Sequence, residues 1–561
     1  MMETLLQKFC PPLPDKPLRL FYLATKESGE SHKVSTNTYF NRFSAGQWAE
    51  ASSLQEVEVR ITTDFDGVLE ICGLSLDGEF LLFRAHFVSG ETLIKKFNPL
   101  GLKSVWVDFY SEKSIAPEGL TIEYHALNSS YQPILSTIAI CTYNKAAFVE
   151  RNIKSLVRTL DTKFISHIFI VNQGDESLDL ESNSIVQVLQ QPNLGGSGGF
   201  ARGIYEFLKT DSQGIILMDD DIVFIPEVLY RILRLASLSG NSFAVSTQML
   251  NLYKPNTVWA DYEIVDLKAL WSAPRGRLQF DANLAPEFQN EANMVAWWCG
   301  YFPRTFVEKA GLPLPIFIHW DDAEYSLRMQ IMPKFQVKTI FGFGVWHEPF
   351  DSKAQWGWIS YFDIRNALIG SSIHGASFYS SYKKVIQTLC VTALSNRYQA
   401  NAAICAGIQD FSKGAASLEG NQRARAMTAF GGYTDSQRER SLKAENLENV
   451  VMRTPLVALL GHFFRALFSR NADMMSAETS LKFSPARAIS KTQETLIYSP
   501  YGGIAECMSW DSAGAKSTYL NSFKIIISFP FKWFKAKKHW RAHFIELTSG
   551  ESWQLRWQDN Q

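Results

Sequence analysis

Three consecutive carboxylates, Asp219, Asp220 and Asp221, follow the apolar run of GIILMDDDIVF. An unpaired charge beside a buried strand is penalised by desolvation, and the helix expected to follow needs only one or two acids in its first turn. A divalent cation explains the run better than capping does, because alternate residues of an extended D-x-D motif point at one ion. Mg2+ and Mn2+ favour carboxylates together with phosphate oxygens. The run therefore predicts a metal site.

A glycine-rich run, QPNLGGSGGFARGIYEF, precedes this motif. Its first four glycines let the backbone approach a ligand closely, and the helix that follows offers free N–H groups to a phosphate. The spacing fits neither G-x-G-x-x-G nor a P-loop, and a flexible turn is the alternative. Together with the metal motif, the run favours a nucleotide diphosphate.

A second carboxylate pair, Asp321 and Asp322, follows an apolar run in PIFIHWDDAEYSLRMQ. The pair either caps a helix or supplies the general base that a transferase to a hydroxyl group needs. His347 follows in FGFGVWHEPF. A lone histidine is usually structural, but a neutral imidazole also suits the coordination sphere of the predicted ion.

Two adjacent tryptophans, Trp297 and Trp298, stand in AWWCGYFPR. Neighbouring residues of a strand point to opposite faces of a sheet. One ring is therefore expected in the core, and the other is expected to offer a flat apolar platform to a sugar.

Alternating strands and helices are predicted to position these residues. ILSTIAICTYN and ISHIFIVNQG indicate strands that end at polar loops, and AAFVERNIKSLVRTL between them indicates an amphipathic helix. This alternation is typical of a mostly parallel sheet covered by helices, whose ligands bind beyond the carboxyl ends of the strands. The loops CTYN, VNQG, PNLGG and MDDD are therefore expected at one edge.

The flanking regions have other patterns. Up to about residue 130 the chain alternates with period two, with Asp-Gly turns at 66–67 and 77–78, and predicts an all-β sandwich. We interpret it as a scaffold or assembly surface in preference to a sugar-binding module. After about residue 375 the pattern is helical, the run at 441–470 included, except that the Ser-, Thr-, Ala- and Gly-rich stretch 470–520 predicts loops.

Composition narrows the classes of protein. A chain of 561 residues predicts several domains, and a net charge of −1 argues against a nucleic-acid binder. The 7 cysteines form no CxxC pair, which is typical of reduced thiols in the cytoplasm. We find no secretory signal pattern and no apolar run of about 18 residues, so neither secretion nor a transmembrane helix is expected.

In chain order, IAICTYNK, VNQG, QPNLGGSGGFARG, MDDDI, WWCGYFPR, FIHWDDAEYSLR and GVWHEPF resemble the galactofuranosyltransferases of glycosyltransferase family 2, including those that build mycobacterial cell-wall galactan. The resemblance implies an α/β domain of the GT-A type. It is expected at residues 134–375, between an N-terminal β-sandwich at 1–133 and a mainly helical domain at 376–561.

The same resemblance implies residue roles. Asp322 is the expected catalytic base and Asp321 its neighbour at the acceptor, while Trp297 and Trp298 are expected to line the acceptor and donor sugars. The implied metal ligands are Asp219, Asp221 and His347. The implied donor-contacting residues are Thr142, Lys145, Gln173, Asn193, Gly195, Gly196, Asp219 and Asp220. Lys145 stands where the family has arginine, which keeps the charge but loses the bidentate fork.

The implied reaction is an inverting transfer of galactofuranose from UDP-galactofuranose to a hydroxyl of a lipid-linked bacterial surface glycan, with Mn2+ or Mg2+. Another donor, UDP-galactopyranose, UDP-glucose or dTDP-rhamnose, is the nearest alternative. A non-catalytic carbohydrate-binding assembly protein and a metal-dependent phosphohydrolase are further alternatives. A homo-oligomer assembled through the β domain is a further expectation.

A basic aromatic segment lies at 523–544, FKIIISFPFKWFKAKKHWRAHF. Its lysines and aromatic rings favour peripheral contact with anionic lipid at the inner face of the cell membrane, and Pro530 argues against a spanning helix. The alternative is a buried aromatic strand beside a solvated basic helix face.

Overall fold

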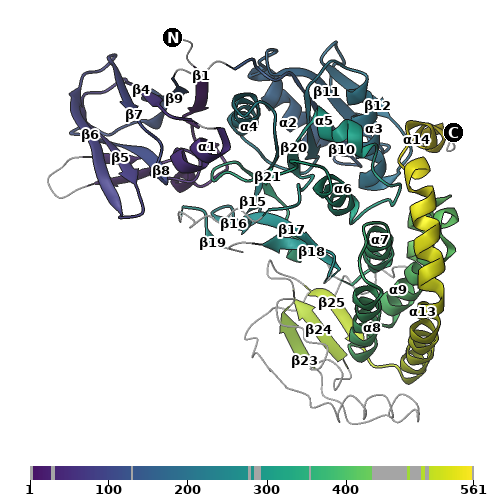
Figure 1. Cartoon of the computed structure of the whole chain (residues 1–561). Helices are drawn as coiled ribbons and strands as arrows, with labels where there is room; N and C mark the ends of the chain where they lie inside the picture. Colours follow the sequence, from purple (N-terminus) through teal and green to yellow (C-terminus); the bar gives the residue numbers. More distant parts are fainter. Residues whose placement is uncertain are drawn as a thin grey trace.

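The computed structural model describes residues 4–558, with the exception of 27–31, 53, 128–130, 269, 276–279, 284–291, 353–355, 432–476, 481–493 and 499–503. Strands near the N-terminus and helices near the C-terminus flank a central α/β region (Figure 1). No helix in the described part of the chain is long and apolar enough to cross a membrane.

A seven-stranded sheet forms the central region, in the order β12-β11-β10-β13-β20-β14-β21. The first four strands of this order are parallel, and β20 is antiparallel to both of its neighbours. The strands are β10 (Ser136–Thr142), β11 (Ile165–Asn172), β12 (Val186–Gln190), β13 (Gly214–Asp219), β14 (Ala244–Ser246), β20 (Cys299–Pro303) and β21 (Val337–Lys338).

Helices cover both faces of this sheet because its central strands are apolar on both sides. Ile138 and Ile140 of β10 share one buried cluster with α2 and α4, whereas Ala139 shares another with α3, α5, α6 and α14. The helices are α2 (Ala146–Arg158), α3 (Gly195–Leu208), α4 (Pro226–Leu238), α5 (Arg304–Ala310), α6 (Asp321–Gln330) and α14 (Gly550–Gln558).

A smaller sheet, in the order β19-β16-β15-β22, lies beside the central one, together with the hairpin β17-β18. Strand β22 runs parallel to β15 and ends at His347, opposite Asn251. These strands are β15 (Gln248–Asn251), β16 (Thr257–Ala260), β17 (Tyr262–Asp266), β18 (Trp271–Arg275), β19 (Phe280–Asp281) and β22 (Gly344–His347).

The N-terminal region contains two sheets and the helix α1 (Ala45–Ser52). Polar contacts fix it to α4, where the Lys8 N–H donates to Glu227 (2.8 Å) and Arg231 donates to the Phe40 carbonyl (2.7 Å). One sheet has the order β1-β9-β4-β7 (Thr4–Lys8, Leu120–Ala126, Val57–Thr63, Thr92–Phe97). The other has the order β2-β3-β8-β5-β6 (Leu23–Lys26, His32–Ser35, Ser104–Ser111, Gly67–Leu74, Glu79–Phe87).

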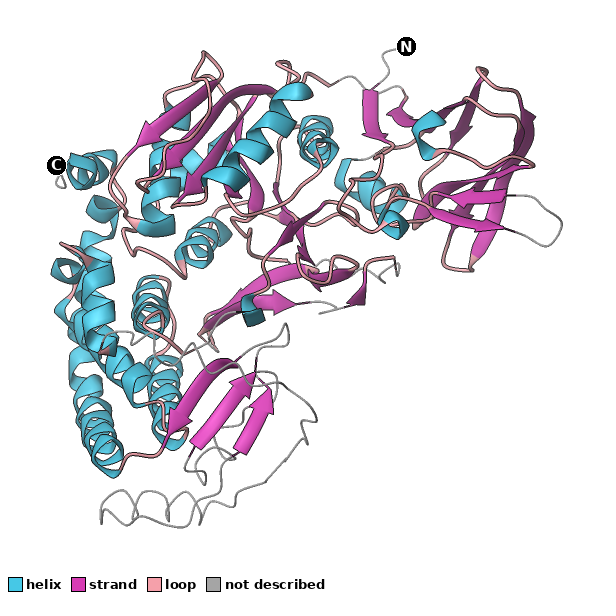
Figure 2. Ribbon diagram, turned by 180° about the vertical axis from the view of Figure 1, so that it is seen from behind, coloured by secondary structure: helices cyan, strands magenta, loops and turns pink. Residues whose placement is uncertain are grey.

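The C-terminal region is a group of long helices with one three-stranded sheet beside them (Figure 2). The helices are α7 (Ser360–Ile373), α8 (Phe378–Leu394), α9 (Tyr398–Lys413), α10 (Gln422–Phe430) and α13 (Ser512–Leu547). The sheet contains β23 (Ala477–Ser480), β24 (Glu494–Tyr498) and β25 (Ile504–Ser509). These strands and the start of α13 show that 470–520 contains regular elements where loops were predicted, while the helical prediction at 441–470 lies outside the described residues.

Buried contacts cross the domain boundary that was predicted between residues 375 and 376. Helix α7 shares a buried cluster with α8, α9 and α13, through residues such as Leu368, Ile404 and Trp533. Helix α14, in turn, contributes Trp553 and Trp557 to the cluster beneath the central sheet. The C-terminal segment therefore supplies part of the core of the α/β region.

The segment 523–544 belongs to α13, which continues through Pro530. Phe529, Trp533 and Trp540 are buried, and the Trp540 indole donates to the Phe411 carbonyl at 2.9 Å. Phe531 and Phe534 of the same helix are 83% and 64% exposed. The aromatic residues of this segment are thus divided between the core and the surface.

Candidate functional site

The carboxyl ends of four parallel strands meet at one edge of the central sheet. Thr142 of β10 pairs with Asn172 of β11, which pairs with Gln190 of β12, and Asp219 of β13 pairs with Cys141. This register brings the four polar loops together, as the strand and helix pattern predicts. This edge therefore gathers polar side chains that could bind a ligand.

Asp219, Asp221 and His347 form a cluster at this edge. His347 Nε2 lies 3.6 Å from an Asp219 oxygen and 3.3 Å from an Asp221 oxygen. One ligand atom from each of the three residues lies within 4.8 Å of the other two. Two carboxylates and an imidazole at this spacing fit a single divalent ion, and the carboxylates favour Mg2+ or Mn2+.

Backbone pairing explains how His347 reaches a motif more than a hundred residues earlier. Val223 and Trp346 exchange two hydrogen bonds of 2.8 Å, N–H to carbonyl in each direction. Val223 follows the three aspartates, and Trp346 precedes His347. This bridge fixes the end of β22 against the loop that leaves β13, so the third ligand is placed by the backbone.

The charge balance of the cluster also favours a cation. Burial alone would lower the pKa of His347, but the Asp219 and Asp221 carboxylates outweigh burial and raise it to about 10. The site thus attracts positive charge strongly enough to retain a proton on the imidazole. A metal ion that takes Nε2 has to replace that proton.

Asp220 points toward the loop after β10. The Tyr143 N–H donates to its Oδ2 at 3.2 Å, while burial and the Asp221 carboxylate raise its pKa to about 7. Thr142 is buried beside this contact, and Lys145 is exposed with its ammonium 5.5 Å from the Phe148 ring. These residues line the expected donor side, and their donor contacts stay predictions.

Gln173 holds the glycine-rich loop by its side chain. Its amide nitrogen donates to the Gly195 carbonyl (2.9 Å) and to Cys141 Sγ (3.2 Å). Its amide oxygen accepts from the Leu194 N–H and from Gln191, both at 2.9 Å. Because both donors and both acceptor positions are used within the protein, we expect Gln173 to shape the donor loop without contacting the donor.

The glycine-rich run itself begins α3 and packs against β10. Gly195 has φ of +71°, and the Asn193 side chain accepts its N–H at 3.0 Å. A Cβ at residue 199 would lie 2.1 Å from Cys141 Sγ, so glycine allows the helix to approach the strand. Gly196 faces the second carboxylate pair, since a Cβ there would lie 2.9 Å from Asp321 Oδ2.

Asp321 and Asp322 begin α6 on the other side of this loop. Ser197 Oγ lies 3.5 Å from Asp321 Oδ2, and the Ala323 N–H donates to Asp322 Oδ1 at 2.7 Å. Burial raises the pKa of Asp321 to about 6. Burial and the Asp321 charge raise that of Asp322 to about 8. A carboxyl group titrating near neutral pH in a site of this kind is suited to proton transfer.

The segment before this pair has an unusual backbone. Phe317, His319 and Trp320 have φ of 73°, 63° and 67°. Non-glycine residues in this region cost about 1–3 kcal/mol each and persist where the surroundings impose them. Here the Asn366 side chain donates to the carbonyls of residues 316, 318 and 319, at 2.8 to 3.0 Å. These hydrogen bonds therefore hold the backbone that leads into α6, whose first two residues are the carboxylates.

The two tryptophans are each only 4% exposed. The Trp298 ring lies 6.3 Å from that of His347, and its indole donates to the Thr247 carbonyl at 3.2 Å. Trp297 packs against Phe200 (4.9 Å) and Tyr325 (5.7 Å) in the core beneath α3. This burial supports the expected core role for one ring, and it argues against an open sugar platform at Trp297.

Two residues near the site, Glu263 and Arg423, were not predicted from the sequence. Glu263 of β17 is buried, and burial together with the Asp322 charge raises its pKa well above the ordinary value. Arg423 of α10 donates to the Tyr143 hydroxyl at 3.1 Å, so the C-terminal helices contact the loop after β10. Glu263 stands in YEIVD, which reads as an ordinary strand, and Arg423 stands in a helix far from every motif.

Residues 137–303 of the chain match the family model of glycosyl transferase family 2. The chain is 27% identical over 426 residues to the galactofuranosyltransferase GlfT2 of Mycobacterium tuberculosis, covering 67% of this chain and 66% of that protein. It is also 27% identical over 430 residues to GlfT2 of Mycolicibacterium smegmatis, covering 66% and 65%. The chain thus spans just under two thirds of the length of these curated relatives.

Among solved structures, the comparison finds a mannosyltransferase from Pyrobaculum calidifontis in complex with GDP-Man and Mn2+. The likeness has 12% identity and a TM-score of 0.30, over 53% of this chain and 79% of that one. We draw no conclusion from a likeness at this score.

Proposed function

On the premise that residues 137–303 form a family 2 glycosyltransferase domain and that the chain resembles two galactofuranosyltransferases, we propose that it transfers galactofuranose from UDP-galactofuranose to a hydroxyl group of a lipid-linked bacterial surface glycan. The observation that carries the proposal is the cluster of Asp219, Asp221 and His347 at the strand ends, with Asp322 close enough for charge coupling to Asp219. A GT-A type arrangement is part of the same proposal.

Asp219, Asp221 and His347 are the residues that would hold Mn2+ or Mg2+. When bound, the ion neutralises the charge that develops on the departing diphosphate. The loop held by Gln173 and Asn193 shapes the donor pocket, and Asp220 fixes the backbone at Tyr143. The protein thereby supplies a preorganised site for the diphosphate end of the donor.

Asp322 is the group we assign to take the proton of the attacking hydroxyl. Its raised pKa lets the carboxylate accept a proton and release it near neutral pH. Asp321, held against α3, orients the acceptor beside it. A direct attack of this kind inverts the configuration at the anomeric carbon and requires no covalent enzyme intermediate.

The identity of the donor is tested with the purified chain and four nucleotide sugars. We expect transfer to a synthetic lipid-linked acceptor from UDP-galactofuranose, and at least about tenfold slower transfer from UDP-galactopyranose, UDP-glucose and dTDP-rhamnose. Product masses and linkages are the measurement. Faster transfer from one of the other three donors would assign the same site to another sugar.

The other classes predict different products. A non-catalytic carbohydrate-binding assembly protein yields no transfer with any donor and tolerates alanine at Asp219 and Asp322. A phosphohydrolase releases phosphate or nucleoside phosphate without an acceptor. The match of residues 137–303 to the glycosyl transferase family 2 model favours transfer over both alternatives.

Peripheral membrane contact is part of the proposal and rests on the surface of α13. Leu520, Phe523, Ile527, Phe531 and Phe534 form a stripe along the helix, each between 47% and 83% exposed. Lys524, Lys532, Lys535 and Lys538 are exposed on the same helix, and no acid occurs between 512 and 545. Exposed apolar rings flanked by lysines suit the headgroup boundary of an anionic membrane.

We expect the chain to sediment with vesicles of anionic phospholipid at low salt and to be released at high salt. Each basic residue near such a surface contributes about 1 kcal/mol, so replacing Lys535, Lys537 and Lys538 by glutamate should abolish binding. Phe531→Asp should weaken binding without changing the lysines. A triple change to glutamate at the exposed Lys113, Lys163 and Lys309 is the matched control. Equal sedimentation of the two triple variants would contradict membrane contact through α13.

A further inference from the structure

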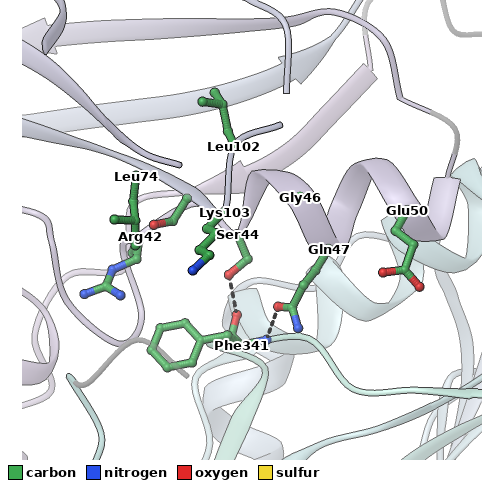
Figure 3. A pocket seen from close by; sticks show the side chains of 10 residues that line it. Arg42, Ser44, Gly46, Gln47, Glu50, Leu74, Leu102, Lys103 and Phe341 are labelled. Atoms are coloured by element: carbon green, nitrogen blue, oxygen red, sulfur yellow. Dashed lines mark hydrogen bonds between the residues drawn. The ribbon is translucent and has the colours of Figure 1, made fainter. Parts of the chain in front are cut away.

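A cavity of about 280 Å³ lies where the N-terminal sheets meet the α/β region (Figure 3). Its walls come from the start of α1, from the loop before β8 and from Phe341, and they include Arg42, Ser44, Lys103 and Ser104. None of the residues that line it belongs to the site described above.

Arg42 is a buried cation with little compensation. Arg42 is only 6% exposed, and its Nη2 donates to the Asn283 carbonyl at 3.2 Å. Its guanidinium lies 5.5 Å from the centre of the Phe341 ring. Within the described residues its Nε has no hydrogen-bond partner, and no carboxylate lies within ion-pair distance. Buried charges are normally paired, so this guanidinium lacks its usual partner.

Ser104 and Lys103 also line the cavity. Ser104 is buried, and its hydroxyl has no hydrogen-bond partner among the described residues. Lys103 is exposed at the rim, where its backbone is fixed by the Leu74 carbonyl at 2.6 Å. Glu50 is the acid that lines the cavity, and Lys338 holds it at 2.9 Å. The Glu79 carboxylate acts on Arg42 from beyond ion-pair distance, so with Glu50 held by Lys338 the cavity keeps one positive charge in excess.

We propose that this cavity binds a small organic anion, a carboxylate or phosphate group carried on a monosaccharide-sized hydroxylated skeleton. The planar guanidinium of Arg42 matches two oxygens of such a group, and Lys103 adds a second charge. Leu74, Leu102 and Phe341 supply an apolar wall. The cavity volume of about 280 Å³ lies just under the range of about 300–1,000 Å³ for drug-sized ligands, so a ligand the size of a single sugar ring fits it.

Occupancy of the cavity would join two parts of the molecule. Arg42 and Lys103 belong to the N-terminal region, whereas Phe341 precedes β22, whose last residue is His347. Ser44 already donates to the Phe341 carbonyl at 3.2 Å, and Gln47 accepts the Phe341 N–H at 2.9 Å. An anion bound here therefore strengthens an existing contact, and its binding does not depend on the proposed transfer reaction.

The test is calorimetric titration of the full chain with D-glucuronate, α-D-glucose 1-phosphate, inorganic phosphate and neutral D-glucose. EDTA is present throughout, so that the metal cluster takes up no phosphate through an ion. We expect saturable binding of at least one acidic sugar and none of glucose. Comparison of glucuronate with glucose 1-phosphate identifies the charged group.

Lys103→Glu and Arg42→Gln should each weaken binding about 10- to 100-fold, the usual loss for a charged hydrogen bond. Arg42→Lys should restore part of it, and Lys113→Glu, the same change at an exposed residue outside the cavity, should leave it unchanged. Asp219→Ala should also leave it unchanged, which separates this site from the donor site. Equal affinity of Lys103→Glu and Lys113→Glu for the acidic sugar would overturn the proposal. The absence of saturable binding of any anion would overturn it as well. Equal affinity for inorganic phosphate and glucose 1-phosphate would overturn its sugar part.

Discussion

Replacing Asp219 or Asp221 by alanine is expected to abolish sugar transfer while the chain stays folded. Each carboxylate lies within 3.6 Å of His347, and the ligand set has no fourth protein member in the described residues to replace it. Loss of the ion removes several kcal/mol of charge stabilisation in the transition state, which corresponds to roughly 1,000-fold or more in rate. The measurement is initial rate of transfer, alongside circular dichroism.

The matched control is Asp211→Ala, an exposed acid close to the opposite end of β13. It should retain full activity. EDTA should silence the wild-type chain, and added Mn2+ or Mg2+ should restore it. Full transfer in the presence of the chelator would remove the metal from the mechanism.

Asp322→Asn should reduce the rate of transfer by about 100- to 10,000-fold, the usual contribution of a general base. The amide has almost the same shape, and its oxygen still accepts the Ala323 N–H that now binds Asp322 Oδ1. UDP binding should survive, because the donor loop is fixed by Gln173 and Asn193. Single-turnover rates and UDP titration measure the two effects separately.

The pH profile supplies an independent check of this assignment. Because burial and Asp321 raise the pKa of Asp322 to about 8, kcat/KM of the wild type should rise with pH through neutrality and level off above 8. The rise should be absent from Asp322→Asn. A near-normal Asp322→Asn together with an inactive Asp321→Asn would reverse the two roles.

Removing the Asp322 charge should also make the chain more stable at pH 8. A carboxyl group whose pKa is raised on folding costs stability increasingly as pH rises from its unfolded value toward its folded value. Asparagine does not carry that cost. A residue that lowers stability and raises the rate is typical of a catalytic position.

Sequence patterns predicted the strand and helix alternation and the three candidate metal ligands Asp219, Asp221 and His347. Asp219 and Asp221 are recognisable because acids after an apolar strand need an explanation. Their distance from His347 was not predictable, since it depends on the isolated bridge between Val223, in the loop after β13, and Trp346 of β22. Such long-range register leaves no local signal in the chain.

The roles of other residues were predicted incorrectly, or not at all, because the sequence does not show which side chains are buried. The glycines of QPNLGGSGGFARG were interpreted as space for a ligand, whereas Gly199 makes room for Cys141. Trp297 and Trp298 are both buried, although alternation in a strand predicted one open ring. Glu263 and Arg42 gave no signal at all, since a lone charge within a strand or loop is ordinarily exposed.

The position of α14 has a consequence for synthesis of the chain on the ribosome. Trp553 and Trp557 fill the same cluster as Phe200 and Trp297, and the Trp553 indole donates to the Pro313 carbonyl at 2.8 Å. Nascent chains fold from their N-terminal side as they are made. The face of α3 that carries Tyr205 therefore emerges without the rings of α14 that cover it, and it stays so until residues 550–558 are released. A nascent chain stalled before residue 550 should present this apolar surface to chaperones, although every strand of its central sheet is already made.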